Sequence, residues 1–256
     1  VQGVYSGPRI SLNAVTGSWE FDPFGAPAGD YHVTYTFTNT FGCPASAGPA
    51  TITVQNRSFS CGGELTDVRD GKKYQTTLLS GRCWMTENLA YGTTLASPGP
   101  LQTDNCLAEK YCSPSDAGCN KYGGMYQWDE LMDYAATPGS KGICPPGWHV
   151  PTIAEWQSLI DNLVSGTGAP HANAVAGSTL KDLLLTGGFH ALMGGLDYND
   201  NTWAFISGSL TGTLYWTSTA TSATHAAARG LNNYNASISH YSSSRGNAFA
   251  LRCVKD

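Results

Sequence analysis

The eight cysteines of this 256-residue chain constrain its fold more than any other feature. No two of them have the CxxC spacing that is typical of a structural zinc site, so their scatter favours disulfide bonds. Disulfides persist in oxidising compartments, and we therefore expect an extracellular or cell-surface, secreted protein. The cysteines are Cys43, Cys61, Cys83, Cys106, Cys112, Cys119, Cys144 and Cys253.

The composition narrows the class of protein further. Only 13% of the residues are charged, the net charge is -5 and no basic stripe occurs, so we expect no nucleic-acid partner. No run of about 18 apolar residues is present, so we expect no membrane span. The chain opens on strand-like sequence, and we expect a mature product or a fragment of a larger surface or appendage protein.

Residues 1–56 predict a small all-β domain. Apolar and polar side chains alternate in "GSWEFDP", "GDYHVTYTFTN" and "GPATITVQ", and Tyr31, Val33, Tyr35 and Phe37 should share one face. About four strands are visible, and the segment resembles the C-terminal half of bacterial Ig-like repeats, which need about seven strands. The upstream half is missing, or neighbouring subunits supply the remaining strands by β-augmentation.

Residues 57–256 predict a second domain that starts with a hairpin and two helices. The hairpin turns at Asp70-Gly71, because glycine tolerates the positive φ of a tight turn. One helix is expected in "GGMYQWDELMDYAA", and another starts in "PTIAEWQSLIDNLVSG", where Thr152 and Glu155 have capping-box spacing. Four strands are then expected in "GGFHALMGG", "NTWAFISGS", "TLYWTSTAT" and "NAFALRCVKD". The expected buried helical stripes are Met125, Trp128, Leu131, Met132 and Ala135, then Trp156, Leu159, Ile160, Leu163 and Val164.

Residues 58–256 resemble a known bacterial module. The resemblance rests on four stretches in order: "DVRDGKKYQTTLLSGRCWMTENLAYG", "YCSPSDAGCNKYGGMYQWDELM", "GICPPGWHVPTIAEW" and "GFHALMGG…LYWTST…ALRCV". Together they are similar to the Fibrobacter succinogenes major paralogous domain of secreted, especially Bacteroidetes, proteins. The resemblance implies an α+β fold of the C-type-lectin-like class, in which two helices flank a twisted, mainly antiparallel sheet.

The resemblance also implies three disulfide bonds. These are Cys61 with Cys83, Cys112 with Cys119, and Cys144 with Cys253. Cys43 and Cys106 are left over; they could join the two domains, or Cys43 has lost its partner with the missing strands.

A polar and aromatic tract near the C-terminus is the strongest candidate for a ligand-binding surface. Between Leu231 and Asn247 most residues are Asn, Tyr, Ser or His, a mixture that antibody loops also use because tyrosine gives contact area at low entropic cost. Aromatic rings could also stack on a glycan. The predicted ligand-binding residues are Trp203, Trp216, Ser218, His225, Asn232, Asn233, Tyr234, Asn235, His240, Tyr241 and Asn247, with Trp203, Trp216, Tyr234 and Tyr241 as stacking surfaces.

The same tract suggests a diversified receptor. Diversity-generating retroelements mutate adenines, and an asparagine codon then yields Tyr, Ser or His. Their targets resemble this chain in carrying the varied positions near the C-terminus of a C-type-lectin-like domain. A soluble loop surface is the simpler alternative.

The sequence gives weaker indications of a metal site or a catalytic site than of a ligand-binding surface. The cluster Asp197, Asn199, Asp200 and Asn201 offers oxygen ligands for calcium, although such residues are more often turns. His149 lies between apolar neighbours and is interpreted as a packing residue. No cofactor is otherwise expected, and no nucleophile elbow or phosphate loop occurs.

We therefore expect a non-enzymatic adhesion module that binds a glycan or protein on another cell or host surface. The alternative is a structural subunit or cap of a surface assembly, docked through the N-terminal strands.

Overall fold

The protein is mainly β. The computed structural model describes residues 3–13, 17–23, 26–38, 44–54, 59–96, 100–113, 116–164, 180–181, 188–192 and 212–256. Of these residues, 43% lie in strands and 9% in helices, so the expected α+β, C-type-lectin-like fold is wrong. Contacts divide the chain into two compact units, Val1–Phe59 and Ser60–Asp256. No helix in the described ranges is long and apolar enough to cross a membrane.

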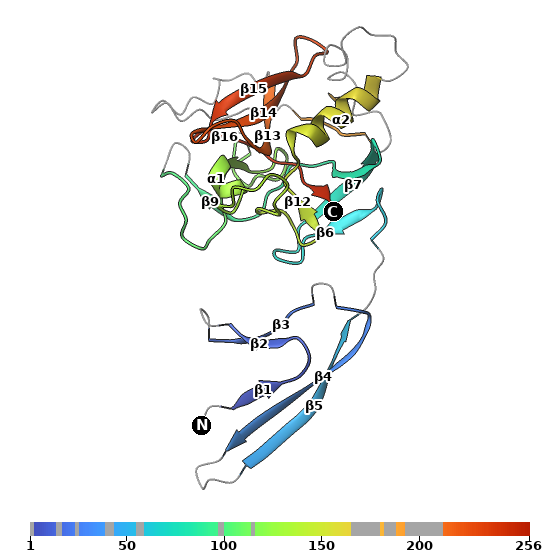
Figure 1. The fold of residues 1–256 in the computed structure, drawn as a ribbon, viewed down its shortest axis with the longest axis vertical. Coiled ribbons are helices and arrows are strands. Elements are labelled where there is room, and N and C mark those ends of the chain that lie inside the picture. The colour runs from blue at the N-terminus through green and yellow to red at the C-terminus, as the bar shows by residue number, and fades with distance from the viewer. Residues whose placement is uncertain are drawn as a thin grey trace. The chain divides into compact units, whose positions relative to one another are not determined.

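The N-terminal unit contains two small antiparallel sheets (Figure 1). In the larger sheet β1 (Val4–Ser6) and β5 (Pro44–Val54) flank β4 (Gly29–Thr38). In the smaller sheet β2 (Ile10–Leu12) pairs with β3 (Trp19–Phe21). The strands follow the sequence alternation, because each glycine-, proline- or asparagine-containing stretch between them interrupts the period of two.

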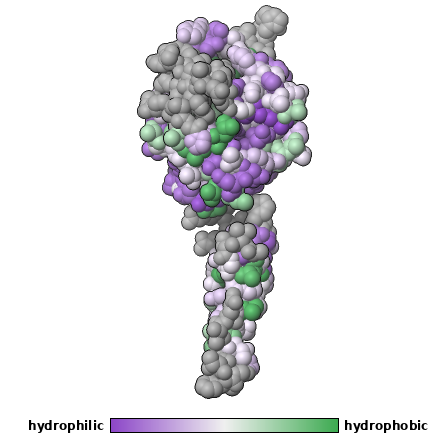
Figure 2. All heavy atoms as spheres, turned by 90° about the vertical axis from the view of Figure 1, so that its left-hand side faces the viewer, coloured by the Kyte–Doolittle hydropathy of each residue, from purple (hydrophilic) through white to green (hydrophobic). Residues whose placement is uncertain are grey.

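Aromatic rings gather on one side of β4. Tyr35 stacks on Phe37 with ring centroids 5.8 Å apart and meets Tyr5 at 4.7 Å, as the alternation predicts for side chains on one face. Val33 alone is buried among the described residues of this unit. Hydrophobic residues, green in Figure 2, therefore reach its surface, and Val4 is 50% exposed.

The C-terminal unit contains a seven-stranded sheet in the order β15-β14-β13-β16-β11-β10-β9 (Figure 1). The pairs β9/β10 and β13/β16 are parallel and the others are antiparallel. The strands are β9 (Thr93–Leu95), β10 (Glu109–Tyr111), β11 (Met125–Gln127), β13 (Gly212–Ala220), β14 (His225–Asn232), β15 (Ser239–Ser244) and β16 (Ala248–Ala250).

A five-stranded sheet in the order β12-β17-β8-β7-β6 completes this unit. Its strands are β6 (Glu64–Thr66), β7 (Lys73–Leu79), β8 (Arg82–Met85), β12 (Trp148–His149) and β17 (Val254–Lys255). The hairpin expected around Asp70-Gly71 is confirmed as β6 and β7. Gly71 has a φ of +75°, and its N–H donates to the Asp67 carbonyl at 2.8 Å.

The second predicted helix is confirmed as α2 (Ile153–Val164). Its capping box is formed, because the Thr152 N–H donates to Glu155 Oε2 at 2.8 Å and the Glu155 N–H donates to Thr152 Oγ1 at 3.2 Å. Three residues of the predicted stripe are fully buried: Trp156, Leu159 and Ile160.

The first predicted helix is wrong over most of its length. It is a single turn, α1 (Trp128–Leu131), because the preceding Met125–Gln127 form β11 and pair with β16. After the turn Asp133 and Tyr134 have φ of 51° and 56°, in the left-handed region through which an α-helix cannot continue. Sheet pairing has overridden a helical apolar pattern here.

The strands expected after residue 177 are partly confirmed. "TLYWTSTAT" forms β13, and "NAFALRCVKD" forms β16 and β17. The described part of "GGFHALMGG", residues 188–192, is not a strand, and "NTWAFISGS" lies outside the described residues. Ser239–Ser244, within the polar tract, forms β15, which the sequence does not predict.

Aromatic rings join α2 to the seven-stranded sheet. Trp156 meets Trp84 at 5.2 Å, Phe189 at 5.4 Å and Tyr215 at 5.5 Å between ring centroids. All four rings are buried, and the edge-to-face contacts of Trp156 with Trp84 and Phe189 add to the stabilisation from burial alone. This cluster holds β13 and its neighbour β14 in place.

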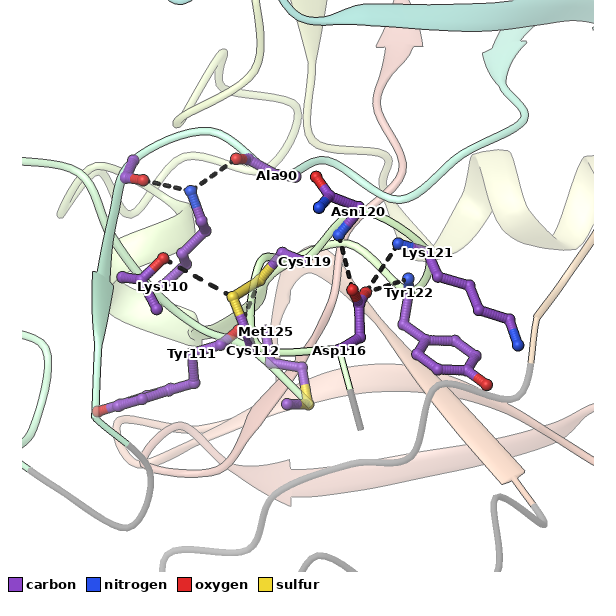
Figure 3. The surroundings of a disulfide bond; sticks show 12 residues. Ala90, Lys110, Tyr111, Cys112, Asp116, Cys119, Asn120, Lys121, Tyr122 and Met125 are labelled. Atoms are coloured by element: carbon purple, nitrogen blue, oxygen red, sulfur yellow. Dashed lines mark hydrogen bonds between the residues drawn. A yellow bond between two sulfur atoms is a disulfide. The ribbon is translucent and has the colours of Figure 1, made fainter. Parts of the chain in front are cut away.

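The three disulfides implied by the resemblance are all present: Cys61–Cys83, Cys112–Cys119 and Cys144–Cys253. The last one closes 109 residues and ties the final strand to the segment before β12. The short Cys112–Cys119 loop is supported by Asp116, whose carboxylate accepts three backbone N–H groups (Figure 3). Those donors are Asn120, Lys121 and Tyr122.

Candidate binding surface

Most predicted ligand-binding residues lie together at β14, β15 and the loop between them. We define the β14–β15 surface as the side chains of His225, Asn232, Asn233, Tyr234, Asn235, His240 and Tyr241; it includes both faces of this sheet edge, because the neighbours His240 and Tyr241 project to opposite sides. All of them are exposed except Asn232, which is partly exposed. Tyr234 is 78% exposed and Tyr241 44% exposed, unusually high values for large rings. The surface therefore presents two aromatic rings to solvent.

The loop that carries Tyr234 has a fixed backbone. Asn232 Oδ1 accepts the N–H groups of Tyr234 at 3.0 Å and of Asn235 at 3.1 Å. Asn235 Oδ1 accepts the Ser237 N–H at 3.0 Å and the Ser237 hydroxyl at 2.6 Å. Asparagine favours such turns because its side chain mimics a backbone carbonyl. The asparagines of the tract thus shape the loop as well as expose polar groups.

A lysine from outside the tract holds the same loop. Lys181 Nζ donates to the carbonyls of Asn232 at 2.7 Å and of Asn235 at 2.6 Å. The two carbonyls bracket Tyr234, so the loop is closed from both ends. The sequence gives no signal for this contact, because Lys181 lies 51 residues before Asn232.

Tyr241 lies on β15 over a glycine of β14. A Cβ added to Gly230 would come within 2.6 Å of the Tyr241 ring, so the ring occupies the space that a side chain would take. Tyr241 pairs in register with Ala228, and small residues thus form the floor beneath it. The ring rests on the sheet while almost half of it remains exposed.

Three predicted ligand-binding residues are instead part of the interior. Trp216 is fully buried, stacks on Phe249 with centroids 4.3 Å apart and donates from Nε1 to the Tyr126 carbonyl at 2.9 Å. Ser218 Oγ accepts the Gly139 N–H at 2.8 Å, and Asn247 is buried at 8% exposed. The structure therefore does not place these residues on the β14–β15 surface. Both faces of β13 are covered here, since Thr213 to Ser218 are all buried, so Trp216 lies in the interior, where its apolar ring contributes most to stability.

Trp203 and the calcium candidates Asp197, Asn199, Asp200 and Asn201 lie outside the described residues. Within the described ranges no group of three or more His, Cys, Asp or Glu side chains could hold a metal ion.

The β14–β15 surface is electrically neutral. No Asp, Glu, Lys or Arg occurs from Gly230 to Ser244. Burial, and then the positive charge of Arg229, lowers the pKa of His240 below its ordinary 6.5, so this ring is uncharged at pH 7. Arg229 itself is buried and donates from Nη2 to Gln157 Oε1 of α2 at 2.7 Å. The Lys181 ammonium lies against the loop but is held there by two backbone carbonyls.

His149 is satisfied by two carboxylates. Its Nε2 lies 3.0 Å from Glu155 Oε1, and its Nδ1 lies 2.6 Å from Asp256 Oδ1. The hydrogen bond to Glu155 raises the pKa of His149 against the opposing effect of burial. This histidine links the start of α2 to Asp256 through polar contacts, so the interpretation as a packing residue between apolar neighbours is replaced by a role in ion pairing.

Sequence reasoning missed a cavity of about 210 Å³ beside α1. Cys106 and Glu130 both line it. The Cys106 thiol is exposed and forms no disulfide within the described part of the chain, whereas Cys43 lies outside it. Glu130 accepts the Glu109 N–H at 2.8 Å and the Tyr134 hydroxyl at 2.9 Å, and burial raises the pKa of its carboxyl. The lining residues are spread from residue 69 to residue 143, so no local motif could reveal the cavity.

Comparison with known proteins identifies one match. The family model of the Fibrobacter succinogenes major domain matches residues 79–255. No curated protein and no solved structure matches the chain. The matched range includes the whole β14–β15 surface and five of the six disulfide-bonded cysteines.

Proposed function

The chain belongs to the Fibrobacter succinogenes major domain family, and we propose that it is an extracellular binding module that captures a glycan or protein ligand through the β14–β15 surface. The three disulfides fit an extracellular protein. We further propose that the protein is secreted and that it adheres to another cell or to a host surface.

One observation carries the proposal: an exposed tyrosine on a preorganised loop. Binding normally costs the entropy of ordering a loop and its side chains. Here Asn232, Asn235 and Lys181 already fix the backbone around Tyr234. The loop is therefore ordered before the ligand binds, and binding loses little further backbone entropy. A tyrosine also has few rotatable bonds and offers a large amphipathic contact area. These properties suit a recognition loop.

β15 supplies further groups to the same surface. Tyr241 offers a second ring that is partly exposed, and the serines of β15 offer hydroxyl groups on both faces of the strand. Rings that stack on the apolar face of a sugar, surrounded by hydroxyl and amide groups, suit a neutral glycan. The same combination suits an uncharged protein epitope.

The test is a glycan and protein array probed with the intact chain. Tyr234→Ala/Tyr241→Ala should lose the captured ligand while the protein stays folded, with only a modest fall in melting temperature, because Tyr234 is mostly exposed and Tyr241 is only partly packed over Gly230. Val68→Ala/Leu107→Ala, which removes two other exposed apolar side chains, is the matched control and should bind normally. Equal capture by both double variants would refute the proposal.

A second function is favoured by the N-terminal unit. Its described residues include a single buried apolar side chain, Val33, whereas Val4, Tyr5 and Leu12 remain exposed. Exposed apolar patches of this kind often mark protein interaction sites. We propose that the unit docks onto a neighbouring subunit of a surface assembly.

This second function is tested separately from ligand capture. Tyr5→Ser/Leu12→Ser should reduce assembly, measured by light scattering of the intact chain, without affecting array binding. If the Tyr5→Ser/Leu12→Ser variant assembles as the unaltered chain does, the docking role is contradicted.

A further inference from the structure

β15 is an unusual sheet edge. It forms one end of the seven-stranded sheet, and no strand of the described chain pairs with its outer side. The strand is six residues long, Ser-His-Tyr-Ser-Ser-Ser, and pairs with β14 from Ser239↔Gly230 to Ser244↔His225 without a register shift. Its outer side therefore offers a row of backbone N–H and C=O groups that no described strand pairs with.

The other edges of the described sheets are protected. Proteins usually guard such edges by short strands, charges, prolines or bulges. The short edge strands have three residues or fewer, and β6 also carries Glu64; these strands are β1, β2, β3, β6, β9 and β12. β5 is long but contains Pro44 and Pro49 and a register shift against β4. β15 has no charge, no proline, no glycine and no shift.

We propose that the outer edge of β15 pairs with β15 of a second copy of this chain, antiparallel and around a two-fold axis. Such a contact is isologous, because each copy uses the same patch. An edge strand with charged residues would bring like charges close together across the axis, at a cost in stability. β15 has no charged residue and therefore avoids this repulsion. The preceding loop avoids it as well, because no charged residue occurs from Gly230 to Ser244.

The distribution of side-chain size fits this pairing. Directly opposite residues of an antiparallel pair share one face of the sheet, so a two-fold axis perpendicular to the sheet must pass between the two copies of a single residue. With the axis at Ser242, Tyr241 lies opposite a serine (position 243) and His240 opposite another (position 244) of the second copy. The two large side chains each meet a small one, and Ser242 meets its own copy. The resulting sheet is continuous through both copies.

This contact is compatible with ligand capture but does not depend on it. Pairing uses backbone groups in the plane of the sheet. Tyr241 projects from a face of the sheet and Tyr234 from a loop. The oligomeric state therefore tests the pairing, and array capture tests the binding surface, with neither result deciding the other.

A charge-swap experiment on the intact chain tests the pairing. Sedimentation velocity over a concentration series should show a dimer of the unaltered chain. Ser242→Glu and Ser242→Lys should each weaken the dimer by about tenfold or more, because like charges then face each other across the axis. An equimolar mixture of the two variants should restore dimers, since Glu then faces Lys. Ser242 is exposed, and circular dichroism checks that each variant is folded.

Thr66→Glu, on the edge strand β6 of the other sheet, is the control and should leave the dimer intact. A monomeric unaltered chain at every concentration would overturn the proposal. So would a dimer that persists in both Ser242 variants when they also carry Tyr5→Ser/Leu12→Ser, which removes docking through the N-terminal unit, or a mixture of the variants that stays monomeric.

Discussion

Glu155 should stabilise the C-terminal unit more than a surface carboxylate does. Its Oε2 accepts the Thr152 N–H at 2.8 Å and the Thr152 hydroxyl at 3.0 Å, while Oε1 accepts from His149 at 3.0 Å and lies 3.1 Å from Arg82 Nη1. Burial alone would raise its pKa, but the hydrogen bonds from His149 and Thr152 lower it from 4.5 to about 2. We expect Glu155→Gln to remove this stabilisation.

The magnitude follows from the pKa. A difference of about 2.5 in pKa between the folded and unfolded states corresponds to about 3.4 kcal/mol at neutral pH. The side chain is partly accessible to solvent, so we expect a smaller loss of about 2 kcal/mol in the free energy of unfolding. Urea denaturation at pH 6 measures this loss, because urea does not screen charges.

The pH dependence has a defined sign. The pKa of Glu155 is lowered in the folded state, so its contribution is complete above pH 4.5 and is lost as the pH falls toward about 2. The pKa of His149 is raised, so its contribution is complete below pH 6.5 and is lost as the pH rises through its folded value. This pair should therefore stabilise the fold most between about pH 4.5 and 6.5.

The control is Glu64→Gln, which breaks the exposed ion pair with Lys73 and should cost less than about 1 kcal/mol. The reasoning is refuted if Glu155→Gln costs no more than this control, or if it leaves the pH dependence of stability between pH 2 and 4.5 unchanged.

Three further predictions follow from the burial, charge and disulfides of the C-terminal unit. Trp216→Ala should lower the free energy of unfolding by about 3–5 kcal/mol, because a buried ring is lost. If this variant melts at the normal temperature but no longer captures the ligand, Trp216 is a binding residue and not a core residue. Ligand affinity should change little between about 0.05 and 0.5 M salt because the β14–β15 surface is neutral; a steep salt dependence in a calorimetric titration would argue against this surface. Replacing Cys144 and Cys253 by serine should cost about 4–5 kcal/mol in urea melts, since this disulfide closes 109 residues; a loss below about 1 kcal/mol would contradict that estimate.

Local signals in the sequence predicted local structure well. The Thr152/Glu155 capping box and the glycine turn of the first hairpin form as expected, because each depends on residues only a few positions apart. The disulfide pairs came from the family resemblance, since no spacing rule determines which cysteines meet. The composition of the tract predicts the exposed tyrosines, because a run of Asn, Tyr and Ser is too polar to form a core.

Non-local pairing explains what the sequence could not show. Met125–Gln127 has a helical apolar pattern, yet it lies between β16 and β10 and pairs as a strand. Ser239–Ser244 has little intrinsic preference for a strand and forms β15 because β14 is its template. Trp216 was expected at the surface, but β16 and β11 supply the core around it. The mainly β character of the protein depends on such contacts, and this is why the expected α+β class failed.

The dissociation constant of the best array ligand tests the binding surface most directly. It should be measured for the unaltered chain, for Tyr234→Ala and for the control Val68→Ala. We expect Tyr234→Ala to weaken binding by about tenfold or more, which corresponds to about 1.4 kcal/mol, while Val68→Ala binds normally. An unchanged dissociation constant in a folded Tyr234→Ala variant would contradict recognition through the β14–β15 surface.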